Sequence, residues 1–383
     1  MNAHWVPLHD EAVGLYIHVP LCDGKCRYCG FYSEPLADHD PASLVSALIA
    51  ELDRYGAVSA IRTAYIGGGS PTCLPPALLG RLVEAVGSRW PSLQEFTVEC
   101  NPGQTNGSVL SMLRCGGVNR LSFGVQSFHA DELALLGRRH SVEQAVRAIR
   151  SAQEMGFDNV GLDLIFAIPG STPASWEFSL QSAVALGVQH ISAYSLSFEP
   201  GTPLDEARQS ATIHSIDEET DRAMYELAID YLNSAGLVQY EISNFAREGF
   251  ACQHNQGCWL NRPYIGIGPA AGSYWQGRRT LNVADIGRYV GRIEASLDPA
   301  EQREQTGRAD RICETAVLNL RTRDGIDLPG FRQATGADFL EVFSAPVRRY
   351  EHQGLIEVDG NRVRLARKAL GVADSVLCDF SAL

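Results

Sequence analysis

Three cysteines near the start of the chain have a spacing that suits an iron–sulfur cluster. Cys22, Cys26 and Cys29 form a C-x3-C-x2-C pattern. Cysteine thiolates hold such clusters because their charge and softness match iron. Three thiolates leave one iron of a 4Fe-4S cluster free to bind another ligand, whereas a fourth would close the cluster. The pattern therefore predicts a cluster that binds a small molecule.

A structural zinc site and buried thiols are the alternatives for these cysteines. Structural zinc usually shows two C-x2-C pairs, or one such pair with two histidines, and only Cys26 and Cys29 have that spacing here. Buried thiols are typical of apolar segments, whereas these cysteines lie among Asp23, Lys25 and Arg27. The cluster is the favoured interpretation.

Other residues that could bind a ligand or take part in catalysis follow or interrupt short apolar segments. Residues 67–71 (GGGSP) could bring backbone N–H groups close to a ligand, and a tight turn is the alternative. Glu99 could accept both hydroxyls of a ribose, and an exposed loop acid is its alternative. Asp163 lies within the apolar run 160–166, where an unpaired carboxylate is costly to bury. A functional role is therefore favoured for Asp163.

The elements that must position these residues alternate between residues 14 and about 204. Short β-rich segments, Gly/Pro loops and amphipathic helices repeat, which favours parallel strands with helical crossovers. The expected strands are 15–19, 64–66, 96–99, 120–125, 160–166 and 190–196. Six βα units are too few for an eight-stranded barrel, and the loops after the strands build the active site of such folds. We therefore expect an α/β fold, an incomplete TIM-type barrel open at one side, whose mouth collects the motifs.

The pattern changes after a long amphipathic helix expected over residues 216–235. Residues 237–274 predict loops and short strands that close the core, and a helix near 286–297 and a polar stretch at 298–308 follow. Helical periodicity and then Asp359-Gly360-Asn361, a strong hairpin signal, predict a small winged-helix-like α+β module. Its acidic and basic residues nearly cancel, so packing is favoured over DNA binding. The predicted division is 1–236, 237–300 and 301–383.

Composition narrows the functional classes. The 383-residue chain has a formal net charge of −13, which disfavours a nucleic acid as partner. It has no stretch of eighteen uncharged apolar residues, and residues 1–5 lack a leader pattern, so we expect no transmembrane segment and a cytoplasmic protein. The reducing cytosol is also where a labile cluster survives, and the other seven cysteines are expected to be free thiols.

The cysteine motif and its flanks resemble those of radical S-adenosylmethionine (SAM) proteins. Residues 16–20 (YIHVP) and 28–31 (YCGF) are similar to the oxygen-independent coproporphyrinogen III oxidase family. The oxidases have another cysteine where this chain has Phe31, which indicates the heme chaperone, HemW-like, branch of that family. The resemblance implies a partial barrel, a 4Fe-4S cluster on Cys22, Cys26 and Cys29, and SAM bound to the free iron.

The resemblance also implies the residues that contact SAM. Residues 69–71 would hold its methionine end, with Ser70 in place of the usual threonine, and Glu99 would bind the ribose. The complete predicted set is Tyr16, Tyr28, Gly69, Ser70, Pro71, Glu99, Gln126, Arg138 and Asp163. Electron delivery through the cluster would cleave SAM to a 5′-deoxyadenosyl radical, so no side chain needs to act as an acid or base.

A second motif concerns heme. The chaperone branch carries His-Asn-x-x-Tyr-Trp, and residues 254–259 (HNQGCW) match it except that Cys258 replaces the tyrosine. The implied heme contacts are His254, Asn255 and Trp259, and both imidazole and thiolate are known axial ligands of heme. Gly272 is a further departure, at a place where a histidine is expected in the chaperones. A partly buried histidine bonded to the backbone is the alternative for His254.

Two functions stay open at this point. One is a heme chaperone that binds heme and transfers it to an accepting protein. The other is a radical SAM enzyme that acts on a porphyrin or another substrate, as an oxidoreductase or a methyltransferase. Both need an electron donor as partner.

Overall fold

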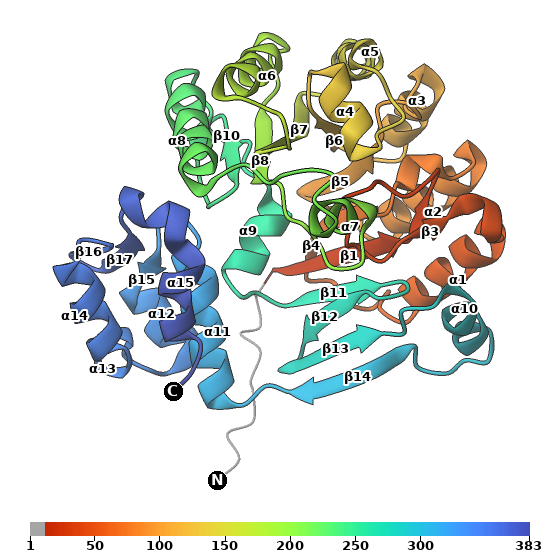
Figure 1. Ribbon diagram of the computed structural model, residues 1–383. Helices are drawn as coiled ribbons and strands as arrows, with labels where there is room; N and C mark the ends of the chain where they lie inside the picture. The colour runs from red at the N-terminus through yellow and green to blue at the C-terminus, as the bar shows by residue number, and fades with distance from the viewer. Residues whose placement is uncertain (1–11) are drawn as a thin grey trace.

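One sheet of twelve strands organises the structure, a computed structural model that describes residues 12–383. The strand order is β14-β13-β12-β11-β1-β4-β5-β6-β7-β8-β10-β9. The predicted lack of a leader pattern concerns residues 1–5, which lie outside the described residues. Figure 1 shows the helices around the curved sheet and a smaller helical unit at the C-terminal end.

All six predicted strands are confirmed, and they lie side by side as one parallel array. They are β1 (Val13–Val19), β4 (Ile61–Gly68), β5 (Glu95–Cys100), β6 (Arg120–Gln126), β7 (Asn159–Phe166) and β8 (His190–Ser195). A further parallel strand, β11 (Tyr264–Ile267), pairs with β1 on its other side. Within the described residues β8 does not pair with β1 or β11 but with β10 (Asn244–Ala246), so the barrel stays open as expected.

Helices follow these strands, and most of them cover the outside of the sheet (Figure 1). They are α1 (Pro41–Asp53), α2 (Pro76–Arg89), α3 (Gly107–Cys115), α4 (Ala130–Leu136), α5 (Val142–Glu154), α6 (Pro173–Ala185), α7 (Pro203–Gln209) and α8 (Glu218–Ser234). Side-chain oxygens cap several N-termini, for example Asp40 before α1 and Asn106 before α3. Such caps satisfy backbone N–H groups that have no partner within the helix.

Side chains alternate along the parallel strands between a polar inner face and an apolar outer face. On β6, Arg120 and Ser122 line a cavity inside the barrel, whereas Leu121, Phe123 and Val125 are fully buried in the hydrophobic core. Successive residues of a strand point to opposite faces of its sheet. The apolar core therefore lies between sheet and helices, and the inside of the barrel is free for polar chemistry.

The segment after α8 corrects two details of the sequence analysis. Residues 237–274 contain the expected short strands, β9 (Val238–Gln239), β10, β11 and β12 (Gly272–Trp275), but also an unexpected helix, α9 (Gln253–Trp259). The polar stretch 298–308 contains strand β14 (Ala300–Gln305), which pairs with β13 (Arg278–Asn282). β14 is an exposed edge strand, so its residues are polar on both faces. Helix α10 (Ile286–Glu294) lies where a helix was predicted.

The C-terminal module combines helices with a small antiparallel sheet. Its main helices are α11 (Arg308–Leu320), α12 (Leu328–Thr335), α13 (Phe339–Val342), α14 (Ser344–His352) and α15 (Ala373–Leu377). The sheet has the order β15 (Ile326–Asp327), β17 (Arg362–Leu365), β16 (Ile356–Asp359). The predicted hairpin is confirmed, and Gly360 adopts a positive φ of 57° in its turn. Among residues 12–383, no helix has both the length and the apolar character to cross a membrane.

Candidate functional site

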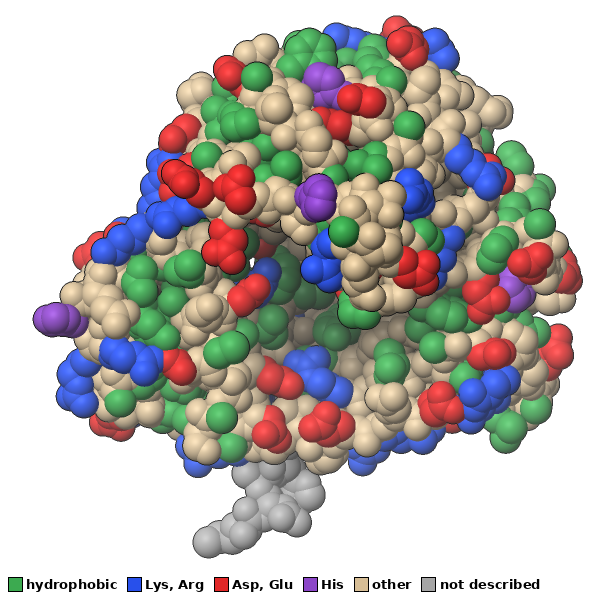
Figure 2. All heavy atoms as spheres, in the orientation of Figure 1, with side chains coloured by type: hydrophobic (Ala, Val, Ile, Leu, Met, Phe, Trp, Pro, Cys, Tyr) green, Lys and Arg blue, Asp and Glu red, His purple; other side chains and the backbone are tan. Residues whose placement is uncertain are grey.

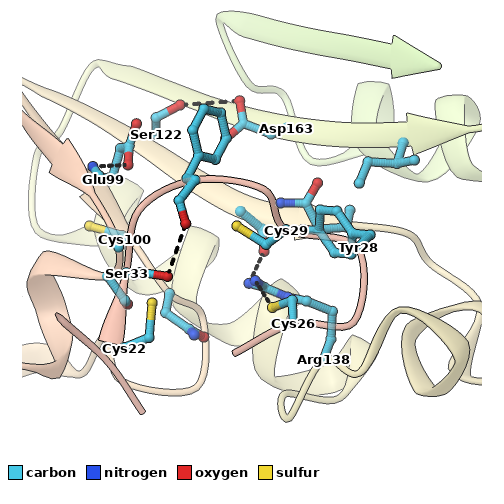
Figure 3. A pocket seen from close by; sticks show the side chains of 18 of the residues that line it. Cys22, Cys26, Tyr28, Cys29, Ser33, Glu99, Cys100, Ser122, Arg138 and Asp163 are labelled. Atoms are coloured by element: carbon cyan, nitrogen blue, oxygen red, sulfur yellow. Dashed lines mark hydrogen bonds between the residues drawn. The ribbon is translucent and has the colours of Figure 1, made fainter. Parts of the chain in front are cut away.

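The inside of the barrel holds a cavity of about 700 Å³ that reaches from the cysteine motif into the strands. Two very short strands, β2 (Leu21–Cys22) and β3 (Glu34–Pro35), flank the loop with the cysteines. Figure 3 shows Glu99, Ser122 and Asp163 on the strands and the three cysteines on the loop beside them. The cavity therefore brings together motifs that are far apart in the sequence.

The cysteine loop is fixed to the barrel by backbone hydrogen bonds. The Arg27 N–H donates to the carbonyl oxygen of Leu136 at 3.0 Å, and the Cys29 N–H donates to that of Cys26 at 3.3 Å. Burial raises the pKa of Cys22 to about 11 and also raises that of Cys29. These thiols are therefore protonated without a metal, and a bound metal must displace the protons. Arg138 Nη1 donates a hydrogen bond to Cys26 Sγ at 3.4 Å.

A cluster and a single zinc ion require different arrangements of the cysteines. Among the described residues, no group of three His, Cys, Asp or Glu side chains is arranged to hold one metal ion. Zinc needs each sulfur at about 2.3 Å from a common centre. In a 4Fe-4S cluster each cysteine binds a different iron, so the sulfurs stand apart. The three half-buried cysteines line one cavity, and the assignment of a cluster to them stays a prediction.

Seven of the nine residues predicted to contact SAM line the cavity. These are Tyr28, Gly69, Ser70, Glu99, Gln126, Arg138 and Asp163. The other two lie next to it: Pro71 follows Ser70 in a short 3-10 helix, and the Tyr16 hydroxyl is 2.9 Å from His18 Nδ1. Binding of SAM by these residues stays a prediction, but their convergence on one cavity is what that prediction requires.

The two carboxyl groups of this set, those of Glu99 and Asp163, are both buried, and the charge of Asp163 acts on Glu99. Glu99 accepts hydrogen bonds from the Tyr65 hydroxyl at 2.9 Å and from the Gly68 N–H at 3.1 Å. Burial, and then the charge of Asp163, raises the pKa of Glu99 to about 7. Burial also raises the pKa of Asp163, although hydrogen bonds from Ser192 and Ser122 oppose this. Burial disfavours the ionised form of each group, and hydrogen bonds from the hydroxyl groups of a ligand would stabilise that form.

Backbone strain marks the end of β6. Gln126 has a positive φ of 71°, which is uncommon for a residue other than glycine, and the register with β7 shifts between Gly124 and Gln126. The Gly124 carbonyl accepts a hydrogen bond from Arg138 Nη2 at 2.6 Å. Arg138 Nε is buried and has no partner in the described part of the chain. Strain and an unpaired cationic donor at one place are typical of a binding site.

The predicted heme residues lie on α9, but they do not face one pocket. His254 is 6% exposed, and its Nδ1 lies 3.1 Å from Thr63 Oγ1 inside the barrel. Asn255 lines the cavity. Trp259 lies at the other end of the helix, against the C-terminal module, where the guanidinium of Arg321 is 4.9 Å from its ring centroid. In this conformation His254 does not fit as a heme ligand through Nδ1, because Thr63 occupies that nitrogen.

Glu95 explains why α9 sits where it does. Its carboxylate accepts hydrogen bonds from the backbone N–H groups of Gln253 at 2.9 Å and His254 at 3.0 Å, at the first turn of α9. A carboxylate at this position satisfies N–H groups that lack partners within the helix and suits the helix dipole. Burial, and then the nearby Arg120, lowers the pKa of His254 to about 4, so its ring is neutral.

The cavity also contains residues that the sequence analysis did not single out. Among them are Tyr65, Arg120, Ser122, His190, Ser192 and Tyr194. Arg120 begins the apolar run 120–125 in the same way that Asp163 interrupts the run 160–166. The argument from burial that selected Asp163 would therefore have selected Arg120 too. The others stand at alternate positions of strands and gave no comparable signal.

Comparisons with known proteins identify the family. The sequence profile of the Radical SAM superfamily matches residues 16–183, and that of the HemN C-terminal domain matches residues 308–371. The heme chaperone HemW of Bacillus subtilis is 34% identical over 373 residues, covering 95% of this chain and 98% of that protein. The mitochondrial radical S-adenosyl methionine domain-containing protein 1 of Bos taurus is 32% identical, covering 96% of this chain and 87% of that protein.

The fold has a close counterpart among solved structures. Coproporphyrinogen III oxidase (HemN) from Escherichia coli, a radical SAM enzyme, superimposes with a TM-score of 0.84. The match covers 97% of this chain and 90% of that one, at 21% sequence identity. At this identity the similarity establishes the architecture, a partial barrel followed by a C-terminal module, and not the reaction.

Proposed function

This chain belongs to the radical SAM proteins of the oxygen-independent coproporphyrinogen oxidase family, in the branch of the heme chaperone HemW, and from this premise we propose that it binds heme and transfers it to an accepting protein. The observation that carries the proposal is the similarity to a heme chaperone over 95% of the chain. Phe31, in place of the oxidases' further cysteine, supports the same branch.

The cofactors of the proposal are a 4Fe-4S cluster on Cys22, Cys26 and Cys29 and SAM in the adjoining cavity. Together, when bound, they supply an electron and a site for reductive cleavage of SAM. The chain's own residues bind and orient. Arg138 offers its guanidinium next to Cys26, and Glu99 and Asp163 offer acceptors for hydroxyl groups.

Heme would bind near α9. Figure 2 shows a hollow near the middle of the face in view, in the region where Figure 1 places α9 and β11, with hydrophobic side chains inside it and charged side chains at its rim. Trp259 Nε1 is buried without a hydrogen-bond partner among residues 12–383, so it could donate to a ligand. Ligation of iron by His254 Nδ1 would first require its hydrogen bond with Thr63 to break, at a cost of about 1 kcal/mol.

Titration with hemin, followed by the Soret absorption, tests this proposal. Wild-type protein should bind about one heme per chain, and His254→Ala should lose or spectrally alter the complex. Thr63→Val should bind heme up to about fivefold more tightly, because it releases the imidazole at no loss of volume. His129→Ala is the matched control, since His129 bonds to the Ser175 carbonyl on the outside of the sheet. Unchanged spectra and affinity in both Thr63→Val and His254→Ala would place the ligand elsewhere, with Cys258 as the next residue to replace.

The cavity favours one alternative function, a radical SAM enzyme acting on a porphyrin or another substrate. It contains polar residues beyond the set predicted for SAM, so a second molecule could share it. Release of 5′-deoxyadenosine in step with a substrate would identify such an enzyme. The electron donor, the heme-accepting protein and a location in the cytosol stay predictions.

A further inference from the structure

His18 lies between the cysteine loop and the residues predicted to bind SAM. It is a buried residue of β1, and both of its ring nitrogens have a partner. Nε2 lies 3.0 Å from the carbonyl oxygen of Tyr32, where the chain leaves the cysteine loop, and Nδ1 lies 2.9 Å from the Tyr16 hydroxyl. One side chain therefore contacts both the exit of the cysteine loop and a residue of the predicted SAM set.

The partners of His18 decide which nitrogen carries its proton. A carbonyl oxygen can only accept a hydrogen bond, so Nε2 carries the ring proton and donates it to Tyr32. Burial lowers the pKa of His18, against the smaller effect of the bond to Tyr32, so the ring is neutral and Nδ1 has no proton. Nδ1 is therefore an acceptor, and the Tyr16 hydroxyl is the donor in the bond between them.

The direction of the Tyr16 hydroxyl matters because it lies in the field of Glu99. Burial, and then the charge of Glu99, raises the pKa of Tyr16, so the phenol keeps its proton. A phenol near a carboxylate tends to turn that proton toward the acid, and Glu99 would then have one acceptor position fewer for the hydroxyls of a ribose. The bond to His18 prevents this. It also leaves the lone pairs of the Tyr16 oxygen available, which suits a positive group such as the sulfonium of SAM.

Gly68 lets the imidazole of His18 pack directly against the glycine-rich loop. A Cβ atom on residue 68 would stand 2.5 Å from His18 Nδ1, and the φ of Gly68 is 110°, so a residue with a side chain does not fit here. The N–H of Gly68 also donates to Glu99 Oε2 at 3.1 Å. The ring of His18 is thus confined by the glycine-rich loop, by Tyr16 and by Tyr32, and it uses both nitrogens in this one orientation.

We propose that His18 is a positioning residue with two separable tasks: Nε2 holds the exit of the cysteine loop at Tyr32, and Nδ1 directs the Tyr16 hydroxyl away from Glu99. The inference deepens the proposed function and rests on its cluster and SAM, to whose predicted contacts it adds a residue that acts through Tyr16. A role in packing alone is the alternative, and it would make no distinction between the two nitrogens.

Two amide variants separate the two nitrogens. In His18→Gln the amide nitrogen reaches as far as Nε2 and can keep the bond to Tyr32, whereas the acceptor for Tyr16 is lost. In His18→Asn the amide oxygen reaches as far as Nδ1 and can keep the bond from Tyr16, whereas the donor to Tyr32 is lost. His129→Gln is the matched control, because His129 Nε2 also bonds to a backbone carbonyl, that of Ser175, and His129 does not line the cavity.

Equilibrium dialysis of SAM and hydrogen exchange of residues 30–35 measure the two tasks. The exchange reports on the loop exit because the Glu34 N–H donates to the Pro20 carbonyl at 2.7 Å. His18→Gln should bind SAM about fivefold more weakly, with residues 30–35 exchanging as in the wild type. His18→Asn should keep its SAM affinity per cluster, with residues 30–35 exchanging about fivefold faster. His129→Gln should match the wild type in both measurements.

A double variant shows whether His18 acts through Tyr16. His18→Gln combined with Tyr16→Phe should bind SAM no more weakly than Tyr16→Phe alone, whereas additive losses would overturn the inference. It is also overturned if His18→Gln and His18→Asn change both measurements alike, or if neither changes its own.

Failure of the proposed function is recognised separately. Wild-type protein that holds no cluster and binds no SAM would contradict that function. Exchange measured without the cluster then decides the inference: faster exchange in His18→Asn but not in His18→Gln supports the hold on Tyr32, and equal exchange overturns it. If His18→Asn does not fold, as circular dichroism will show, the double variant decides.

Discussion

The two ends of the barrel interior are made by the same strands, yet they are built in different ways. At the carboxyl ends, glycines, thiols and a strained residue lie on loops or at strand termini, and they converge on the cysteine motif. At the amino ends, single polar residues such as Glu95, Arg120 and His190 lie on the strands themselves. Helix α9 covers this end, and Glu95 accepts a hydrogen bond from its first turn. The first end carries the residues predicted to bind cofactors, whereas the second carries buried polar residues, one of which, Glu95, holds α9 in place.

This difference has an energetic consequence. At the loop end the functional side chains contribute little to packing, so their replacement should affect ligands more than folding. At the α9 end each polar group is buried, and removal of one partner leaves another unsatisfied, which is destabilising. The following predictions test this contrast, in order of decreasing effect.

The largest effect is expected at the cysteines. Replacement of Cys22, Cys26 or Cys29 by Ala should abolish the 4Fe-4S cluster while the fold persists, because the loop lies outside the hydrophobic core. Iron and sulfide analysis and the visible absorption after anaerobic reconstitution measure this. Cys73→Ser is the control, since Cys73 Sγ bonds to the Leu21 carbonyl next to the loop and is outside the motif. A triple variant that keeps its iron would refute the assignment, and zinc without iron in the wild type would restore the zinc site.

The second effect concerns stability at the α9 end. Glu95→Gln should lower the free energy of unfolding by about 2 kcal/mol, because two N–H groups of α9 lose a charged acceptor. Urea denaturation measures the loss, with Glu84→Gln on the exposed face of α2 as control. Cluster content should be unchanged. Loss of the cluster together with stability would show that the two ends are not separable.

The third effect returns to the loop end. Glu99→Ala and Asp163→Ala should each weaken SAM binding by about tenfold, since each removes an acceptor facing the cavity, without loss of iron. Equilibrium dialysis of SAM against the reconstituted protein measures this. Gln144→Ala serves as a control that also lines the cavity but lies outside the predicted SAM set. Wild-type affinity in both acid variants would place SAM elsewhere.

The smallest effect is a dependence on pH. Because the pKa of Glu99 is raised to about 7, the carboxyl is largely protonated below neutral pH and accepts fewer hydrogen bonds from ribose. SAM affinity should therefore rise a few fold between about pH 6 and pH 8, and Glu99→Gln should remove the rise. The effect on folding has the opposite sign: a raised carboxyl pKa stabilises the folded state at low pH, and that contribution is lost as pH rises through about 7. A pH profile shared by wild type and Glu99→Gln would assign the titration to another group.

The sequence was sufficient to predict the residues that form recognisable motifs and the strands that alternate with amphipathic helices. All six parallel strands and the hairpin at Gly360 were predicted, and so was the convergence of Glu99, Asp163 and the cysteine loop, because parallel strands end at one edge. The predicted residue roles still await experiment.

Other features depend on contacts between distant residues. Helix α9 has seven residues and contains Gly257, so its local helix propensity is weak, and Glu95 holds it from far along the chain. Strand β14 has the composition of a polar linker because both of its faces are exposed. The meeting of Arg120 and His190 follows from the register of β6, β7 and β8 at Gly161, which no local pattern specifies.

The central claim, a heme-carrying radical SAM protein, is tested most directly in one anaerobic sample that contains reconstituted protein, SAM, a reductant and hemin. Bound heme per chain and released 5′-deoxyadenosine are measured together over time. We predict about one heme per chain and no release of 5′-deoxyadenosine above that of the sample without hemin. No Soret change, together with rapid release of 5′-deoxyadenosine on addition of a porphyrin, would contradict the chaperone and establish the enzyme.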